Sequence, residues 1–493
     1  MPASTRLGAP LALSSPPKAP ARKWLAFSAI GLWLVTTVMS MTMVAVALPA
    51  IAESFSITLG HVGWVVIINS LIISALMLPM GRAADTFGRL RMHLWGIVLF
   101  AAGALSIALA PTFALLLTGR ALMAVGSAMG QSVGTAMIVA VFPPEERGKA
   151  IGSQTTAVAI GAASGPILGG VILDVLSWQA LFALLLVPVL VAFVVGVVVL
   201  DESMVSPAGD VVAAPYDWPG AVISALAITS LVMVINNPLR LTITSPWLLG
   251  LIGLGIALSV AFVLHERRFA HPMLRLEFFS DRLFALLSIT RILGFMGTTT
   301  NFFLTPVYLI SVRGVSSLTA GSVMFANSLC LAVSAQIVGR LSDRYGNTPF
   351  IISGFALTAA TGIGVSLVTS ASPLWLVAIL VALLGIAMGM WNVPNNATLI
   401  GRVSSRHHGV VGALTNLLRN LGNVTGQAVS VSLVAGVMAM RGFDVPLGEV
   451  SSVVGATEAF EAGWRAAYLL VAALAVVAMG LSWLAQRSER SAT

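Results

Sequence analysis

Three arginines lie inside long apolar runs of this chain, at Arg120, Arg291 and Arg419. An ionised side chain in an apolar run is costly, and it usually faces a polar interior and marks a pathway or a binding site. No aspartate or glutamate lies near the middle of any of these runs. Cations without interior acids favour an anionic or neutral amphiphile over an organic cation as the bound molecule. Arg291 is near the end of its run, so its side chain can alternatively extend to the polar boundary of the membrane instead of facing the interior.

Amide side chains accompany the third arginine. They recur at intervals of three or four residues, so they form one stripe along a helix that Arg419 borders. The stripe consists of Asn416, Asn420, Asn423 and Gln427. It can line a cavity or join neighbouring helices by hydrogen bonds, and both interpretations stay open. The residues expected to bind a substrate are Arg120, Arg291, Asn301, Asn327, Trp391, Asn392, Asn395, Asn416, Arg419 and Asn423.

A nine-residue motif occurs twice, as GRAADTFGR at 81–89 and as GRLSDRYGN at 339–347, 258 residues apart. Each copy ends an apolar run and carries one aspartate among glycines, which permit tight turns and close helix approach. A carboxylate there can accept hydrogen bonds from the positive end of a neighbouring helix. Such a contact, made in one conformation and broken in another, is typical of a gate; anchoring of a loop is the alternative. The gating candidates in the two copies are Gly81, Asp85, Gly88, Arg89, Asp343 and Arg344.

Composition places the chain in a membrane. It has 493 residues, 58% of them hydrophobic and 9% charged, and a mean hydropathy of +0.97. Apolar runs of about 20 residues are long enough to cross a bilayer as helices, which satisfy their own backbone groups. We predict fourteen spans, near 27–52, 61–80, 92–110, 113–141, 150–173, 180–200, 218–237, 247–265, 284–309, 318–338, 349–370, 374–400, 409–440 and 464–485.

The distribution of basic residues predicts the orientation. With both termini on the inside, the inside segments hold 19 of the 26 lysines and arginines and the outside loops hold 4. This asymmetry follows the positive-inside rule and accounts for the net charge of +8 without nucleic-acid binding. We therefore expect a multi-pass protein of an inner (cytoplasmic) membrane with both termini in the cytoplasm.

The motif repeat divides the chain into similar parts, because each copy follows the second span of a set of six. The fold class predicted is all-α, with two six-helix bundles and two extra central helices. We expect a disordered cytoplasmic tail over 1–23, a six-helix bundle over 24–203, a linker with two spans over 204–283, and a second bundle with a short tail over 284–493.

These residues resemble the major facilitator superfamily, and specifically its fourteen-span drug:proton antiporter branch. The first motif copy matches the superfamily's loop motif at Gly81, Ala84, Asp85, Gly88 and Arg89, and Ala47-Leu48-Pro49 and Arg120 match further family positions. The run GAASGPILGG at 161–170 is similar to the antiporter motif of exporters. Its Gly165 and Gly169 permit close packing and Pro166 predicts a kink, so these three join the gating candidates.

The chain departs from that branch at the residues that the resemblance assigns to proton coupling. The branch usually has an aspartate in the first span, where this chain has Ser40, and Gln-Gly after the fourth-span arginine, where it has Met123-Ala124. The nearest titratable acids are Asp174 and Glu53, near the outer ends of their spans. They are the coupling candidates, and either can instead be solvated.

The resemblance implies an exporter of hydrophobic or amphipathic small molecules that works by alternating access, coupled to protons. The alternative is an exporter of a specific anionic metabolite or lipid with atypical or no proton coupling, which the missing acid at Ser40 favours. A membrane sensor or scaffold has no need of two gating motifs. The chain lacks a nucleotide-binding loop and a catalytic constellation, so we expect neither an enzyme nor a cofactor or metal. The expected partners are a small-molecule substrate, protons and the lipid bilayer, with the protein a monomer.

Overall fold

The computed structural model describes residues 20–57, 59–206, 215–237, 241–242, 244–404, 407–443, 450, 453 and 455–490. The predicted tail over 1–23 lies almost wholly outside them. Throughout these ranges the regular structure is helical, and fourteen helices are long and apolar enough to span a membrane, which confirms the predicted number. They are α1 (Pro20–Ser54), α3 (Trp64–Phe87), α4 (Arg89–Ala108), α5 (Phe113–Val141), α6 (Arg147–Val175), α7 (Trp178–Val199), α9 (Trp218–Asn236), α10 (Pro246–Arg268), α11 (Arg282–Val307), α12 (Ser317–Tyr345), α13 (Thr348–Ser366), α14 (Leu374–Gly401), α15 (His408–Met440) and α16 (Ala456–Arg490).

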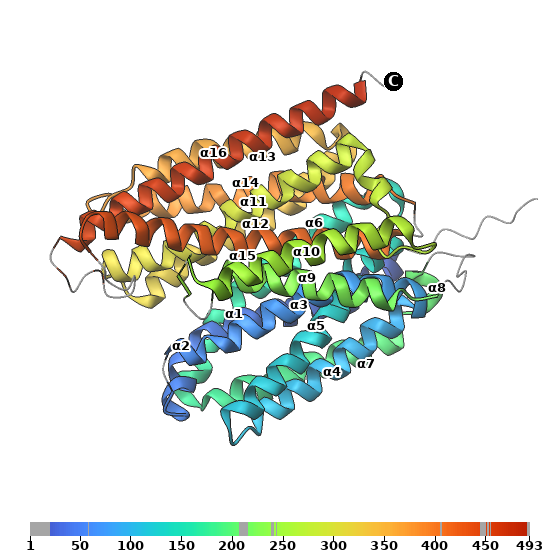
Figure 1. The fold of residues 1–493 in the computed structure, drawn as a ribbon, viewed down its shortest axis with the longest axis horizontal. Coiled ribbons are helices and arrows are strands. Elements are labelled where there is room, and N and C mark those ends of the chain that lie inside the picture. Colours follow the sequence, from blue (N-terminus) through green and yellow to red (C-terminus); the bar gives the residue numbers. More distant parts are fainter. Residues whose placement is uncertain are drawn as a thin grey trace, which may run out of the picture.

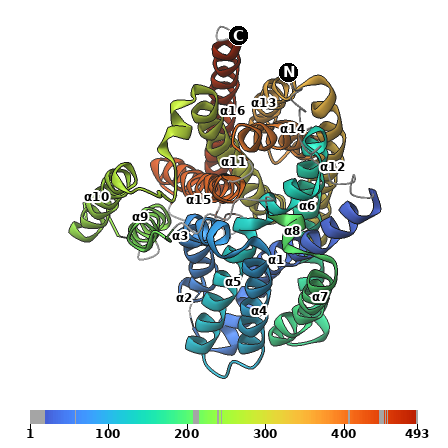
Figure 2. The same cartoon turned by 90° about the vertical axis from the view of Figure 1, so that its right-hand side faces the viewer.

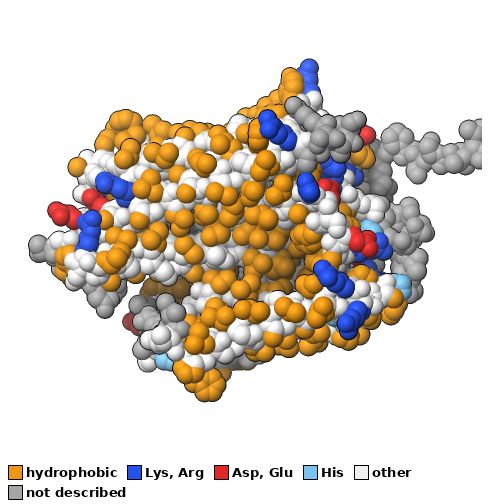
Figure 3. Space-filling view, turned by 45° about the horizontal axis from the view of Figure 1, so that its top comes forward, with side chains coloured by type: hydrophobic (Ala, Val, Ile, Leu, Met, Phe, Trp, Pro, Cys, Tyr) orange, Lys and Arg blue, Asp and Glu red, His pale blue; other side chains and the backbone are white. Residues whose placement is uncertain are grey.

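Shorter helical segments connect some of the spans. They are α2 (Leu59–Val62), α8 (Glu202–Val205), the 3-10 turns η1 (Pro144–Glu146) and η2 (Leu276–Ser280), and the π-helical end of α11, η3 (Tyr308–Val312). Polar caps fix several helix starts: Thr112 accepts the N–H of Leu115 in α5, and Asp281 accepts the N–H of Leu283 in α11. Hydrophobic side chains cover much of the visible surface and charged ones gather toward its two ends (Figure 3), as a bilayer requires.

The long helices form two bundles that lie side by side (Figures 1 and 2). The first half contains α1 and α3–α7, and the second half contains α11–α16. Each half has its own apolar core, with Trp33 and Phe182 at the centre of one and Tyr308 and Trp464 at the centre of the other. Helix α8 spans the boundary predicted at 203/204 and packs on α4 and α5.

The two remaining spans, α9 and α10, flank the seam between the halves. Helix α9 packs on α3 of the first half and on α15 of the second, and α10 packs on α9 (Figure 2). Tyr216 donates a hydrogen bond to the carbonyl of Pro79 in α3 (3.1 Å), and Asp217 is fully buried against His265 Nε2 (2.8 Å). Burial and the Asp217 charge raise the pKa of Tyr216 to about 12, so it remains a neutral donor.

The halves meet mainly at one end of the molecule. Between described residues, the side-chain hydrogen bonds that join the halves all lie between the middle of the bundle and the end where the two motif copies lie. We call this end the motif end, and the other the far end. Toward the far end, the surface in Figure 3 is hollowed between the halves. The structure is therefore closed at the motif end.

Candidate functional site

The first motif copy joins the halves through Asp85, in the last turn of α3. One carboxylate oxygen of Asp85 accepts the backbone N–H of Val410, in the first turn of α15 (3.2 Å). The other accepts both Nη2 (3.1 Å) and Nε (3.3 Å) of Arg89. Arg89 in turn donates to the carbonyl of Val205 and, through its backbone N–H, to Glu202. The predicted contact between this carboxylate and a helix start is present, within a buried ion pair that belongs to the first half.

The second copy makes the equivalent contact with the halves exchanged, because its carboxylate belongs to the second half and the helix start belongs to the first. Asp343, in the last turn of α12, accepts the backbone N–H of Gly148 (2.7 Å) and of Lys149 (2.9 Å), at the start of α6. The unsatisfied N–H groups of a helix start and its positive dipole favour a carboxylate there. Asp343 is exposed, and Arg344 beside it points its guanidinium at the ring of Tyr345 rather than at the aspartate.

Glycines permit the close crossings that these contacts need. The first glycine of each copy, Gly81 or Gly339, faces the start of a helix from the other half. A Cβ at Gly339 would collide with the carbonyl of Gly148, and one at Gly81 would collide with Ala413. The later glycines, Gly88 and Gly346, have φ of +103° and +86°, which turn the chain between helices in a conformation that side chains disfavour.

The remaining gating candidates, in the run 161–170, lie within the first half, away from the seam. Gly165 and Gly169 face α1 of their own half, where a Cβ at 165 would collide with Thr42 and with the carbonyl of Met39. Pro166 lies inside α6 and is exposed. These residues fix α1 against α6 within the first half, and the contacts between the halves are made nearer the start of α6.

The expected substrate-binding residues divide into separate groups. Arg120 is buried in the first half, where its Nε donates to the carbonyl of Val65 (3.2 Å). In the second half, Asn395 donates to the carbonyl of Leu287, and Asn423 accepts from Thr299. These contacts fit inter-helix hydrogen bonding, the alternative that the sequence left open for the amides.

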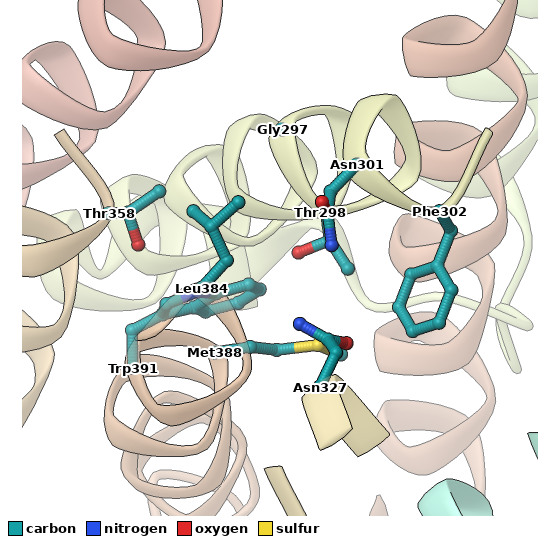
Figure 4. Close-up of a pocket in the computed structure, with 9 residues that line it drawn as sticks. All are labelled: Gly297, Thr298, Asn301, Phe302, Asn327, Thr358, Leu384, Met388 and Trp391. Carbon is teal, nitrogen blue, oxygen red and sulfur yellow. The ribbon is translucent and has the colours of Figure 1, made fainter. Parts of the chain in front are cut away.

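Asn301, Asn327 and Trp391 come together in a small pocket inside the second half. Figure 4 shows the side chains of Asn301 and Asn327 facing one another, with Met388 and Trp391 beside them. Asn327 donates to the carbonyl of Val381 (2.5 Å), and Asn301 accepts from Thr305 (2.9 Å). Helices α11, α12, α13 and α14 contribute the lining, so this pocket lies within one half.

Trp391 supports that pocket by packing rather than by hydrogen bonding. Its ring stacks on Phe355 with centroids 5.1 Å apart and meets Phe295 edge-on at the same separation. Replacing Trp391 with alanine is expected to lower the free energy of unfolding by about 3–5 kcal/mol, because it leaves a large cavity. Thermal unfolding in detergent measures this loss. Trp375, on the same helix but 64% exposed, provides the matched Trp375→Ala control, for which little change is expected.

Arg291, Asn392, Asn416 and Arg419 form a polar layer that reaches the seam. Arg291 is buried and donates through Nε to the carbonyl of Thr415 (2.9 Å) and through Nη1 to Asn392 Oδ1 (3.1 Å). Arg419 donates to Gln131 Oε1 of the first half (3.0 Å), and Asn416 donates to the carbonyl of the same residue (3.0 Å). Sequence reasoning missed Gln131, although a glutamine in a span is itself a signal.

The proton-coupling candidates both lie at the far end and are exposed. Glu53 is in the last turn of α1, and Asp174 is in the last turn of α6. Ser40, where the family resemblance led us to look for an acid, is buried and donates to the carbonyl of Thr37 (3.1 Å). Glu53 and Asp174 therefore lie away from the hydrogen bonds that close the seam at the motif end.

Two similar six-helix halves that close on one another at one end have the architecture of a secondary transporter. The family model described as Major Facilitator Superfamily matches residues 29–427, and the chain belongs to this family. Members of the family are transporters rather than enzymes.

Its relatives include transporters that are named for different substrates. It is 28% identical over 414 residues to the riboflavin transporter RibZ of Clostridioides difficile, covering 84% of this chain and 89% of that protein. It is 26% identical over 440 residues to the multidrug efflux pump LfrA of Mycolicibacterium smegmatis, covering 89% and 86%. Among solved structures, the proton:xylose symporter XylE matches with a TM-score of 0.66 at 12% identity, over 94% of this chain and 96% of that one, which shows the shared fold.

Proposed function

We propose that this protein is a secondary active transporter that exports hydrophobic or amphipathic small molecules by alternating access. The observation that carries the proposal is the paired closure at the motif end, where Asp85 meets the start of α15 and Asp343 meets the start of α6. Both contacts cross the seam and neither is covalent, so the two halves can separate there while each half keeps its own core. Similarity to multidrug efflux proteins supports export as the direction.

We assign the motif end to the cytoplasm of a cell membrane. The segments between spans at that end carry most of the basic residues, which the positive-inside rule places in the cytoplasm. An even number of spans then brings both termini to the same side. In this orientation the structure is closed toward the cytoplasm, the state in which an exporter releases its substrate.

We further propose that proton entry drives export. Reconstituted in proteoliposomes, the protein is expected to move an amphipathic fluorescent dye faster when a pH gradient is imposed, and a protonophore is expected to remove the difference. Coupling then has to use an acid other than one at position 40, and Asp174→Asn and Glu53→Gln are the variants to compare first. Dye movement at the same rate with and without the gradient would contradict proton coupling and leave the transport proposal intact.

A further inference from the structure

The two arginines of the second half lie at the same depth. Arg291 is the tenth residue of α11 and Arg419 the twelfth of α15, and both helices begin at the motif end. At about 1.5 Å per residue, each lies about 15 Å along its helix, near the middle of a bilayer. Arg291 donates to the carbonyl of Thr415, which lies one helical turn before Arg419, so the two positive charges lie in the same layer.

This positive charge has no counter-charge within the described part of the protein. The hydrogen-bond acceptors of Arg291 and Arg419 are neutral: the carbonyl of Thr415, the amide of Asn392 and the amide of Gln131. Every described aspartate and glutamate in a span lies within two turns of a helix end. A buried cation beside a half-buried one, without an anion, is costly, because hydrogen bonds to neutral groups offset only part of the lost hydration.

Of the two arginines in this polar layer, Arg419 is the more exposed. Arg291 is 3% exposed and lies over the ring of Phe295, with its guanidinium carbon 5.1 Å from the centroid. Arg419 is half-buried and lies at the seam, where Gln131 of the first half holds one of its Nη atoms. A molecule that enters between the halves therefore meets Arg419, and Arg291 behind it adds to the positive potential.

We propose that Arg419, positioned by Gln131 and reinforced by Arg291, is an anion-recognition site, and that the substrates are amphipathic organic anions. A carboxylate, sulfonate or phosphate oxygen accepts from a guanidinium in charge-assisted bonds that are stronger than those to an amide. This inference rests on the proposed transport function and specifies the chemical class of its substrate.

The test compares two xanthene dyes of similar size and opposite charge, fluorescein and rhodamine 6G, in proteoliposomes. The wild-type protein is expected to transport fluorescein faster than rhodamine 6G. Arg419→Gln, which keeps hydrogen-bonding capacity but removes the charge, is expected to slow fluorescein transport about tenfold, the effect of losing one charged hydrogen bond. Arg419→Lys is expected to keep most of the activity. Arg441→Gln, an exposed arginine at the end of the same helix, is the matched control and is expected to change nothing.

The outcomes separate this inference from the function on which it rests. Wild-type transport of rhodamine 6G together with unchanged fluorescein transport by Arg419→Gln would overturn the anion site while leaving the transporter standing. If the wild-type protein transports neither dye, both the anion site and the transport function are overturned. If Arg419→Gln does not fold, thermal stabilisation of the wild-type protein by fluorescein, compared with that by its uncharged diester, decides the matter. Equal stabilisation by the two compounds would contradict the site.

Discussion

Replacing Asp85 with asparagine is expected to lower both transport and stability. The carboxylate of Asp85 pairs with Arg89 in a site where the two side chains are 8% and 3% exposed. Removing one partner of a buried ion pair costs about 3–5 kcal/mol. The variant also weakens the hydrogen bond from Val410 that closes the seam. Thermal unfolding in detergent and dye transport in proteoliposomes measure the two effects.

The equivalent substitution in the second copy separates gating from stability. Asp343 is exposed, and it accepts hydrogen bonds from two backbone N–H groups of the other half, so Asp343→Asn is expected to slow transport without lowering the unfolding temperature. Spin labels at Phe87 and Tyr345, exposed residues at the motif end of each half, are expected to move apart in this variant. Glu145→Gln, which removes a nearby exposed charge, is the control. Unaltered label distances and transport in Asp343→Asn would exclude a gating role for this contact.

The long-range part of the site could not be predicted from the sequence, although the fold could. Each span is a separate apolar run, so fourteen helices can be predicted without knowing their packing. The two aspartates were identified because their motif repeats. Their partners were not, because Gly148 is 195 residues away from Asp343 and contributes only a backbone N–H. A helix start offers that group whatever its side chains are, so no sequence pattern marks it.

The sequence also does not show which polar residues of the spans lie together. Helices that are apolar on every side do not show which face turns inward. Ten residues expected to bind a substrate therefore included Arg120, which lies in the first half, and Asn301, which lies in a pocket within the second. Gln131, the residue that joins Arg419 to the other half, is marked in the sequence only by being a glutamine within an apolar span, without a repeat or a charge.

Replacing Gly148 with valine is expected to disfavour closure of the motif end. A Cβ at this position would collide with the carbonyl of Gly339 and with the Asp343 carboxylate, so α6 and α12 cannot cross at their present separation. Forcing extra carbon atoms into a packed site costs about 1–3 kcal/mol, which lowers the equilibrium constant for closure by about fivefold to about a hundredfold. The penalty falls on the closed state alone, because the two helices belong to different halves. Transport is therefore expected to fall with little loss of thermal stability.

The same helix supplies the control for this prediction. Gly170 lies near the other end of α6, and a Cβ there has no atom within 4 Å, so Gly170→Val tests the effect of valine on the helix itself. Gly148→Ala is expected to have an intermediate effect, because it adds the colliding carbon without the two methyl groups. If Gly148→Val transports dye as fast as Gly170→Val, the α6–α12 crossing does not have to close during transport. A low unfolding temperature for Gly148→Val alone would instead show that this crossing holds the two halves together in every state of the cycle.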